Sequence, residues 1–164
     1  MSKVTSKKLL RVETFLAFLV GICFGRMSPS YIFKDTTIGP TKGKVLNIDD
    51  VPVRNTVHVD DQGVEITKQQ FIEPFEIPNF AGFSVATFLP GQTMLPPHDH
   101  ESLHEIFYVL SGSGVFQIED VDHEIDPGSY LQIAPKERHG IWVPKSSSEP
   151  LKMVVIGIAV GDKK

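Results

Sequence analysis

Cysteine is nearly absent from this sequence of 164 residues, which contains only Cys23. A single cysteine excludes an intrachain disulfide, so no disulfide framework can replace a hydrophobic core. The sequence also lacks an Asn-x-Ser/Thr acceptor for N-glycosylation. Its length and its hydrophobic content of 41% are sufficient for one domain with a substantial core.

Positive charge is scarce as well. The net charge is −4, and no stripe of Lys and Arg occurs after residue 54. Proteins that bind DNA or RNA need a basic surface to neutralise phosphate groups. We therefore expect no nucleic-acid partner.

Long hydrophobic runs are missing too. The longest apolar stretch, Phe15–Gly25, has eleven residues, whereas a bilayer-spanning helix needs about 20. The stretch follows a basic region that contains Lys3, Lys7, Lys8 and Arg11. This layout is typical of a signal sequence, and the position of the charges favours an orientation with the N-terminus inside. We predict an N-terminal apolar helix within residues 1–25.

Three roles fit this predicted helix. It is an uncleaved signal-anchor that tethers the protein to a membrane through residues 9–25, a cleaved signal peptide, or a helix that packs on the domain. The first two roles place the protein at a membrane or in the secretory pathway. The third is compatible with a cytoplasmic protein.

Helical periodicity is absent after residue 45, where no apolar pattern of helical period extends over ten residues. Residues 26–44 are rich in Ser, Pro, Gly, Thr and Lys and are predicted to form a linker. Residues 45–164 contain short apolar-rich segments separated by Gly/Pro turns, which predicts an all-β sandwich or barrel. The main predicted strands are Phe83–Leu89, Thr93–His98, Glu105–Leu110, Val115–Glu119, Val121–Ile125, Ser129–Ile133, His139–Val143 and Leu151–Val160.

Against this background, three histidines and one glutamate form a pattern. His98 and His100 are two residues apart, so in an extended strand both side chains point to the same face. Glu105 begins the next apolar-rich segment, and His139 begins a more distant one. Three imidazoles and a carboxylate suit a first-row divalent metal ion and leave coordination positions open. The sequence therefore predicts a metal site inside a β-structure.

The same segment resembles the first motif of the cupin superfamily, which runs from a Gly through His-x-His and Glu to a second Gly. Here six residues separate Gly91 from His98, one more than usual, and the spacing from His98 through Glu105 to Gly112 fits without adjustment. The resemblance implies a double-stranded β-helix, or jelly-roll barrel, with core motifs within residues 80–160. It also implies that His98, His100, Glu105 and His139 are the metal ligands.

The second cupin motif is less complete. Gly128 keeps its usual spacing to His139, but Ala134, Lys136 and Val143 stand where Pro, Gly and Asn are usual. Pro135, one place later than usual, is expected to supply the turn instead. His58 is expected to occupy a solvent-facing strand position rather than to act as a ligand.

Two functions fit the predicted site. The first is a metal-dependent enzyme that acts on a small oxygen-rich or oxidisable substrate, as a dioxygenase, decarboxylase or isomerase. The second is a non-catalytic module that binds a small molecule or a metal. The complete ligand set favours the enzyme, whereas the lack of an obvious catalytic acid or base favours the module.

The cofactor expected for either function is one divalent ion, and the ligand set is compatible with Fe²⁺, Mn²⁺, Ni²⁺, Zn²⁺ and Cu²⁺. No organic cofactor site and no catalytic residue are assigned. Because exposed sheet edges often pair with a second copy, we also expect a homodimer.

Overall fold

The structure is a computed structural model that describes residues 42–60 and 62–160. In these residues one short 3-10 helix, η1 (Ile48–Asp50), precedes ten β-strands. The strands are β1 (Val53–Val59), β2 (Glu65–Ile72), β3 (Phe80–Phe88), β4 (Thr93–His98), β5 (Leu103–Ser111), β6 (Gly114–Ile118), β7 (Val121–Ile125), β8 (Tyr130–Ile133), β9 (His139–Trp142) and β10 (Leu151–Ala159).

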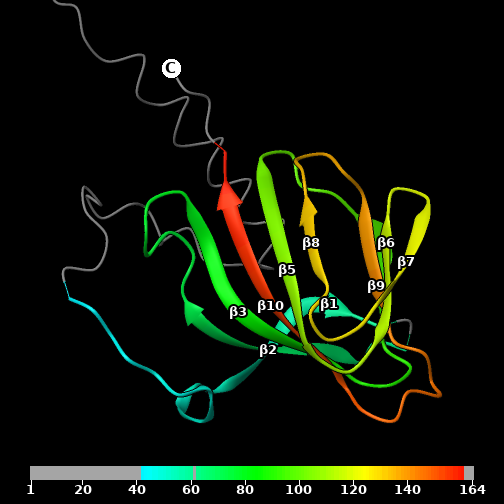
Figure 1. Cartoon of the computed structure of the whole chain (residues 1–164). Coiled ribbons are helices and arrows are strands. Elements are labelled where there is room, and N and C mark those ends of the chain that lie inside the picture. Colours follow the sequence, from blue (N-terminus) through cyan, green and yellow to red (C-terminus); the bar gives the residue numbers. More distant parts are fainter. Residues whose placement is uncertain (1–41, 61, 161–164) are drawn as a thin grey trace, which may run out of the picture. The chain divides into compact units, whose positions relative to one another are not determined.

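The strands form two antiparallel sheets (Figure 1). The larger sheet has the order β1-β2-β3-β10-β5-β8, and the smaller one has the order β4-β9-β6-β7. Successive strands such as β4 and β5 lie in different sheets, which is the arrangement of a jelly roll. The all-β jelly-roll prediction is therefore confirmed.

Each of the eight strands predicted after residue 80 is present, and β4 and β7 have the predicted bounds. Pro96 and Pro97 lie within β4, although proline lacks the N–H that a central strand must donate. The position of β4 at the edge of its sheet explains why they are tolerated, since an edge strand need not pair on both sides.

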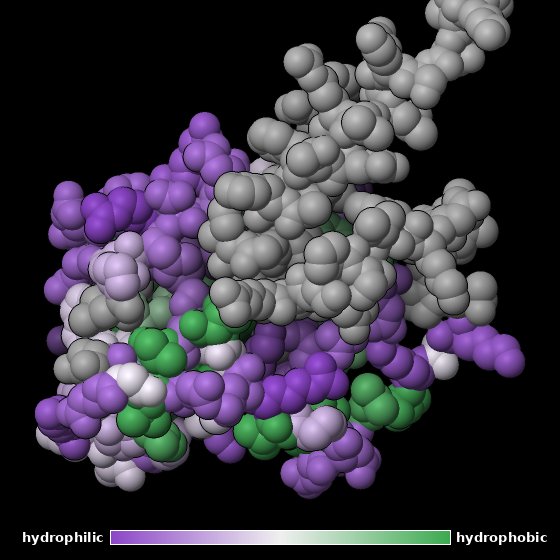
Figure 2. Space-filling view, turned by 180° about the vertical axis from the view of Figure 1, so that it is seen from behind, coloured by the Kyte–Doolittle hydropathy of each residue, from purple (hydrophilic) through white to green (hydrophobic). Residues whose placement is uncertain are grey.

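The hydrophobic core lies between the two sheets. The larger sheet contributes Ile66, Phe88, Phe107, Val109 and Met153, among others, and the smaller sheet contributes Met94, Phe116, Ile125 and Ile141. Burial of each such side chain stabilises the fold by roughly 1.5–3 kcal/mol. We call the core-facing side of the larger sheet its inner face. On the face shown in Figure 2 hydrophilic residues predominate, and hydrophobic residues form small groups.

Strand β1 reverses the usual alternation of polar and apolar residues. Its valines are exposed, with exposed fractions of 65% for Val53, 41% for Val57 and 43% for Val59. Thr56 and His58, which alternate with Val57 and Val59, are partly buried. The expectation that His58 faces solvent is therefore wrong, because its ring lies on the side of β1 that faces His98, 4.8 Å away.

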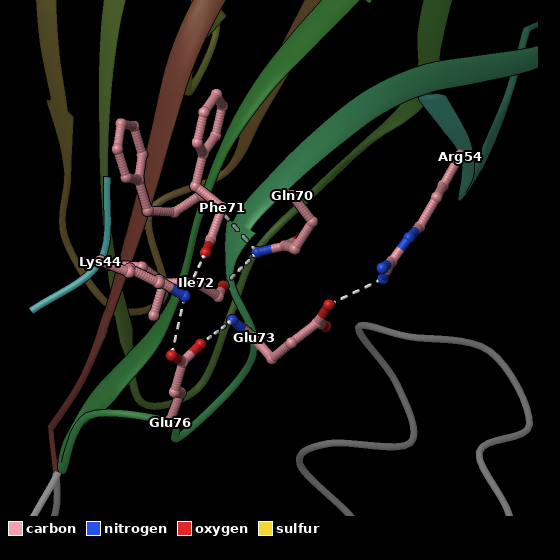
Figure 3. A network of polar contacts seen from close by, with 8 residues as sticks. Lys44, Arg54, Gln70, Phe71, Ile72, Glu73 and Glu76 are labelled. Carbon is pink, nitrogen blue, oxygen red and sulfur yellow. Dashed lines mark hydrogen bonds and ion pairs between the residues drawn. The ribbon is translucent and has the colours of Figure 1, made fainter. Parts of the chain in front are cut away.

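A polar network fixes the chain segment before β1 (Figure 3). The Lys44 ammonium donates hydrogen bonds to the carbonyl oxygen of Phe71, at 2.9 Å, and to Oε1 of Glu76, at 2.8 Å. Nearby, Arg54 in β1 forms an ion pair of 2.8 Å with Glu73. The last residue of the predicted linker is thus held against the connection between β2 and β3.

The predicted N-terminal helix and most of the predicted linker lie outside the described residues. Within residues 42–60 and 62–160, no helix has the length and hydrophobicity that crossing a membrane requires.

Candidate metal site

The four predicted ligands come together at one point of the barrel. His98 ends β4, His100 follows in the next loop, Glu105 lies in β5 and His139 begins β9. Their ligand atoms all lie within 4.8 Å of one another. The site joins both sheets, since His98 and His139 are paired residues of the smaller sheet and Glu105 belongs to the larger one.

The two histidines of the His-x-His pair converge as the sequence predicts, although only one lies in a strand. The ring centroids of His98 and His100 are 4.9 Å apart, and that of His139 lies 4.5 Å from His98 and 5.6 Å from His100. The three imidazoles therefore surround a common point rather than stacking into the core.

Glu105 is the acidic centre of this cluster. Its Oε2 atom lies 3.2 Å from Nε2 of His100 and 3.0 Å from Nε2 of His139. The side chains of Glu105 and His100 are 15% and 10% exposed, whereas that of His139 is 1% exposed. Solvent therefore reaches the cluster from the side of His100 and Glu105, and His139 forms its inner wall.

The protonation states suit metal binding. Burial opposes ionisation of Glu105, but the imidazoles of His100 and His139 outweigh it and hold the pKa of this carboxyl below its usual range. Burial, together with the neighbouring histidines 139, 58 and 100, lowers the pKa of His98 to about 3. At neutral pH Glu105 is thus ionised and His98 is neutral, which are the forms that bind a metal ion.

The orientation of His139 is fixed by its surroundings. Its Nδ1 atom lies 3.3 Å from the carbonyl oxygen of Glu137, and the Phe116 ring stacks on the imidazole at 6.0 Å with an interplanar angle of 5°. A proton on Nδ1 donated to that carbonyl leaves the lone pair on Nε2. Nε2 is buried and lies 3.0 Å from Oε2 of Glu105, so with the proton on Nδ1 two acceptor atoms face each other. A buried nitrogen of this kind is costly unless it binds something, so the donor set fits a metal ion.

Phe107 completes the inner wall of the site. It shares its strand face with Glu105, two residues away in β5, and is 3% exposed. Its ring lies 5.0 Å from that of Phe116 and 5.9 Å from that of His139. These rings exclude water from the core side of the cluster.

The loop before β9 brings His139 into the cluster although the second motif is incomplete. Pro135 and Lys136 form the turn, as expected from the sequence, and the N–H of Glu137 donates to the carbonyl oxygen of Ala134 at 3.2 Å. Lys136, at the usual glycine position, adopts a left-handed conformation with φ of +69°. The departures from the motif therefore change the residues of the turn, and His139 still joins the cluster of predicted ligands.

Two further residues, His58 and Lys68, were not assigned to the surroundings of the cluster from the sequence. The ring of His58 in β1 lies 4.8 Å from that of His98. Lys68 in β2 lies on the same strand face as Ile66 and Gln70, both buried, and interacts electrostatically with Glu105. Strand alternation indicated that His58 and its flanking valines face opposite ways, but the sequence did not show which side is the interior.

The fold and site together define a jelly-roll barrel with a cluster of three histidines and one glutamate between its sheets. Residues 84–157 match the sequence model of the Cupin domain family. The barrel that these residues form is a cupin barrel. A search of curated proteins found no match.

Several solved structures share this fold. A predicted oxalate decarboxylase from Thermotoga maritima is 21% identical, with a TM-score of 0.63, over 71% of this chain and 100% of that chain. The polyketide cyclase RemF from Streptomyces resistomycificus is 23% identical, with a TM-score of 0.59, over 71% and 80% of the two chains. A sugar phosphate isomerase of the cupin superfamily from Silicibacter pomeroyi is 18% identical, with a TM-score of 0.59, over 71% and 76%. At these identities the likeness concerns the fold alone.

Proposed function

We propose that this protein is a metal-dependent enzyme that acts on a small oxygen-rich or oxidisable substrate. The observation that carries the proposal is the convergence of four ligand atoms within 4.8 Å, one each from His98, His100, Glu105 and His139. Among them the buried Nε2 of His139 lies 3.0 Å from Oε2 of Glu105. The names of the structural neighbours, a decarboxylase, a cyclase and an isomerase, indicate that this fold supports varied reactions on small molecules.

The roles of the residues follow from their positions. The four ligands would hold one divalent ion, with His139 fixed by the Glu137 carbonyl and by Phe116. The bound ion would supply Lewis acidity toward an oxygen ligand, lower the pKa of a bound water or, as iron, support dioxygen chemistry. Phe107 and Phe116 exclude water behind the cluster, so substrate would approach from the solvent-reached side of His100 and Glu105.

Elemental analysis of the protein, purified without a histidine tag and without added metal, tests this proposal. Near-stoichiometric iron would favour oxygen chemistry, and manganese, nickel or zinc would favour decarboxylation, isomerisation or hydrolysis. Absence of metal, even after titration with each ion, would contradict the proposal and favour a non-catalytic binding module.

A pair of variants identifies the ligands in the same assay. His100→Ala should lower the metal content strongly while the β-signature in circular dichroism is retained. His123→Ala is the matched control, since His123 lies exposed on β7, outside the cluster. Wild-type metal content in His100→Ala would show that His100 is not a ligand.

A further inference from the structure

The outer face of the larger sheet, opposite its inner face, is unusually apolar. An antiparallel sheet that meets water on one side normally carries polar residues at alternate positions on that side. Here the outward positions of three adjacent strands, β10, β5 and β8, carry mostly apolar residues, which include Ile106, Tyr108, Leu110, Tyr130, Val154 and Ile156. None of the outward residues of β8, or of β5 from Ile106 to Leu110, carries a charge.

The chain itself covers one part of this face, at β2. The Gln69 side chain, which points outward, donates hydrogen bonds to the carbonyl oxygens of Ile48, at 2.7 Å, and Val51, at 2.8 Å. Val51 and Val85 are only 6% and 4% exposed, yet neither belongs to the core cluster between the sheets. Val85 is paired with Gln69 across β2 and β3. The segment that contains η1 therefore lies on the outer face at β2, next to Val85.

The other part of the outer face, at β5 and β8, is open. Tyr108 and Leu110 in β5 are each 45% exposed, and Tyr130 in β8 is 59% exposed. Tyr108 and Tyr130 are directly paired across the two strands, so their side chains lie side by side. We call these three residues the outer patch. Because β8 is an edge strand, the outer patch extends to the edge of the larger sheet.

A second exposed apolar group lies in the segment before η1. Val45 is 99% exposed, and its neighbour Leu46 is 48% exposed. Figure 1 shows this segment, at the cyan end of the coloured chain, outside both sheets. All residues from 42 to 47 are exposed. We call Val45 and Leu46 the arm.

The arm cannot reach the outer patch of its own chain. It is held at β2 on both sides, by the Lys44 ammonium on the Phe71 carbonyl and by the Gln69 amide on the Ile48 carbonyl. The four chain steps between Lys44 and Ile48 span at most about 14 Å when fully extended, and half of that out and back. Strand β5 lies three strands away from β2, which is roughly 14 Å at the usual strand spacing.

We propose that the arm of each protomer packs on the outer patch of a second copy of this chain, in a two-fold dimer along the β8 side of the larger sheet. Each protomer supplies one arm and one patch, so the same contact occurs twice. The two surfaces match in chemistry, since the arm is aliphatic and the outer patch offers two aromatic rings and a leucine. The dimer removes from water two apolar groups that a single chain leaves exposed.

The area that a dimer needs favours this exchange over contact between the two patches alone. A stable interface buries about 800 Å² of each partner. An aromatic side chain can bury about 150–250 Å², so three half-exposed side chains supply less than half of that area. Exchange of the arms adds the exposed residues 42–47 of each protomer to the interface.

Sedimentation equilibrium of the full-length protein in a mild detergent tests the contact. Val45→Glu and Leu110→Lys should each raise the dissociation constant of the dimer about 100-fold or more, because each leaves an unpaired charge in an apolar interface. The double variant, with both substitutions, should recover most of the affinity, since opposite charges then meet across the interface. Circular dichroism should be unchanged in all three variants, because Val45 and Leu110 are exposed in the single chain.

Val121→Glu is the matched control, since Val121 is an exposed valine on β7 of the smaller sheet, and this variant should dimerise like wild type. A wild-type protein that stays monomeric up to high concentration would overturn the proposal. A dimer that either single variant leaves unchanged would overturn it as well, because another surface would then hold the protomers together. Loss of the dimer in both single variants without recovery in the double variant would overturn the pairing of arm and patch.

Discussion

The N–H of Lys136 donates a hydrogen bond of 2.8 Å to the carbonyl oxygen of His100. This contact joins the loop before β9, which leads into His139, to the loop after β4, which contains His100. Lys136 makes it from a left-handed conformation, with φ of +69°. Lys136 stands where the cupin motif usually has glycine. Its backbone therefore adopts a left-handed conformation that is strained for a residue with a side chain.

Lys136→Gly should raise the free energy of unfolding by about 0.5–1 kcal/mol. Glycine removes the steric cost of the left-handed conformation, and the greater entropy of the unfolded chain offsets part of this gain. The ion pair between Lys136 and Glu101, 3.2 Å long and exposed, contributes little. Urea denaturation provides the measurement, with Lys136→Ala as the control that loses the ion pair but keeps the strain. A glycine variant no more stable than the alanine variant would show that the turn is unstrained.

Glu105→Gln should weaken metal binding by about 100-fold or more. Mutation of residues that only hydrogen-bond to metal ligands already lowers metal affinity by about 10–100-fold, and the loss of a ligand should cost more. The amide removes the only negative charge of the cluster while it preserves the size of the side chain. Glu101→Gln is the matched control, since the Glu101 side chain is 71% exposed and pairs with Lys136. Competition with a chromophoric chelator measures both affinities, and comparable losses in the two variants would argue against Glu105 as a ligand.

The barrel from β3 to β10 could be predicted from the sequence because two independent signals agree there. Short apolar segments with Gly/Pro turns gave the strands, and the spacing from His98 to Glu105 placed three ligands on neighbouring segments. The turn at Gly112 illustrates why such positions are restricted. With φ of +74°, an added Cβ would lie 2.3 Å from the carbonyl oxygen of Pro150, so only glycine fits.

The contribution of β1 and β2 could not be predicted in the same way. Hydrophobic alternation would place the valines of β1 inside, whereas Val57 and Val59 are exposed and His58 faces the cluster. Lys68 would likewise be assigned to solvent by its charge. Their orientation depends on how these strands pair at the edge of the larger sheet, which is a long-range contact that the local pattern does not encode.

Residues 1–25 should anchor the protein to a membrane. Their basic start and eleven-residue apolar stretch predict an uncleaved signal-anchor, with a cleaved signal peptide as the nearest alternative. The intact mass should be retained and the protein should stay in the membrane fraction after a high-salt wash. A mature form that lacks these residues would support cleavage, and an intact protein in the soluble fraction would contradict both roles.

The described barrel has sheet edges at β1 and β8 in one sheet and at β4 and β7 in the other, and we expect one of them to pair with a second copy. Sedimentation equilibrium of the detergent-solubilised protein should give the mass of a dimer. A mass that stays monomeric up to high protein concentration would rule the pairing out.

Acid should destabilise the metal-free protein well before ordinary carboxyl groups titrate. The pKa of His98 is about 3 in the folded protein against a usual value of 6.5, so between these values only the unfolded chain binds the proton. The free energy of unfolding therefore falls as the pH drops through this window. The lowered pKa of Glu105 acts in the same direction once the pH falls below its usual value of 4.5.

Urea denaturation in EDTA at pH 7, 6 and 5 measures the effect of His98. His98→Gln should show a smaller loss of stability over this range than wild type, because the unfolded variant has one proton fewer to bind. The exposed His123 provides the control, and His123→Gln should keep the wild-type pH dependence. If the free energy of unfolding depends on pH equally in all three proteins, His98 is protonated in the folded barrel as readily as in the unfolded chain. The fold would then not favour the neutral form of His98 that binds a metal ion.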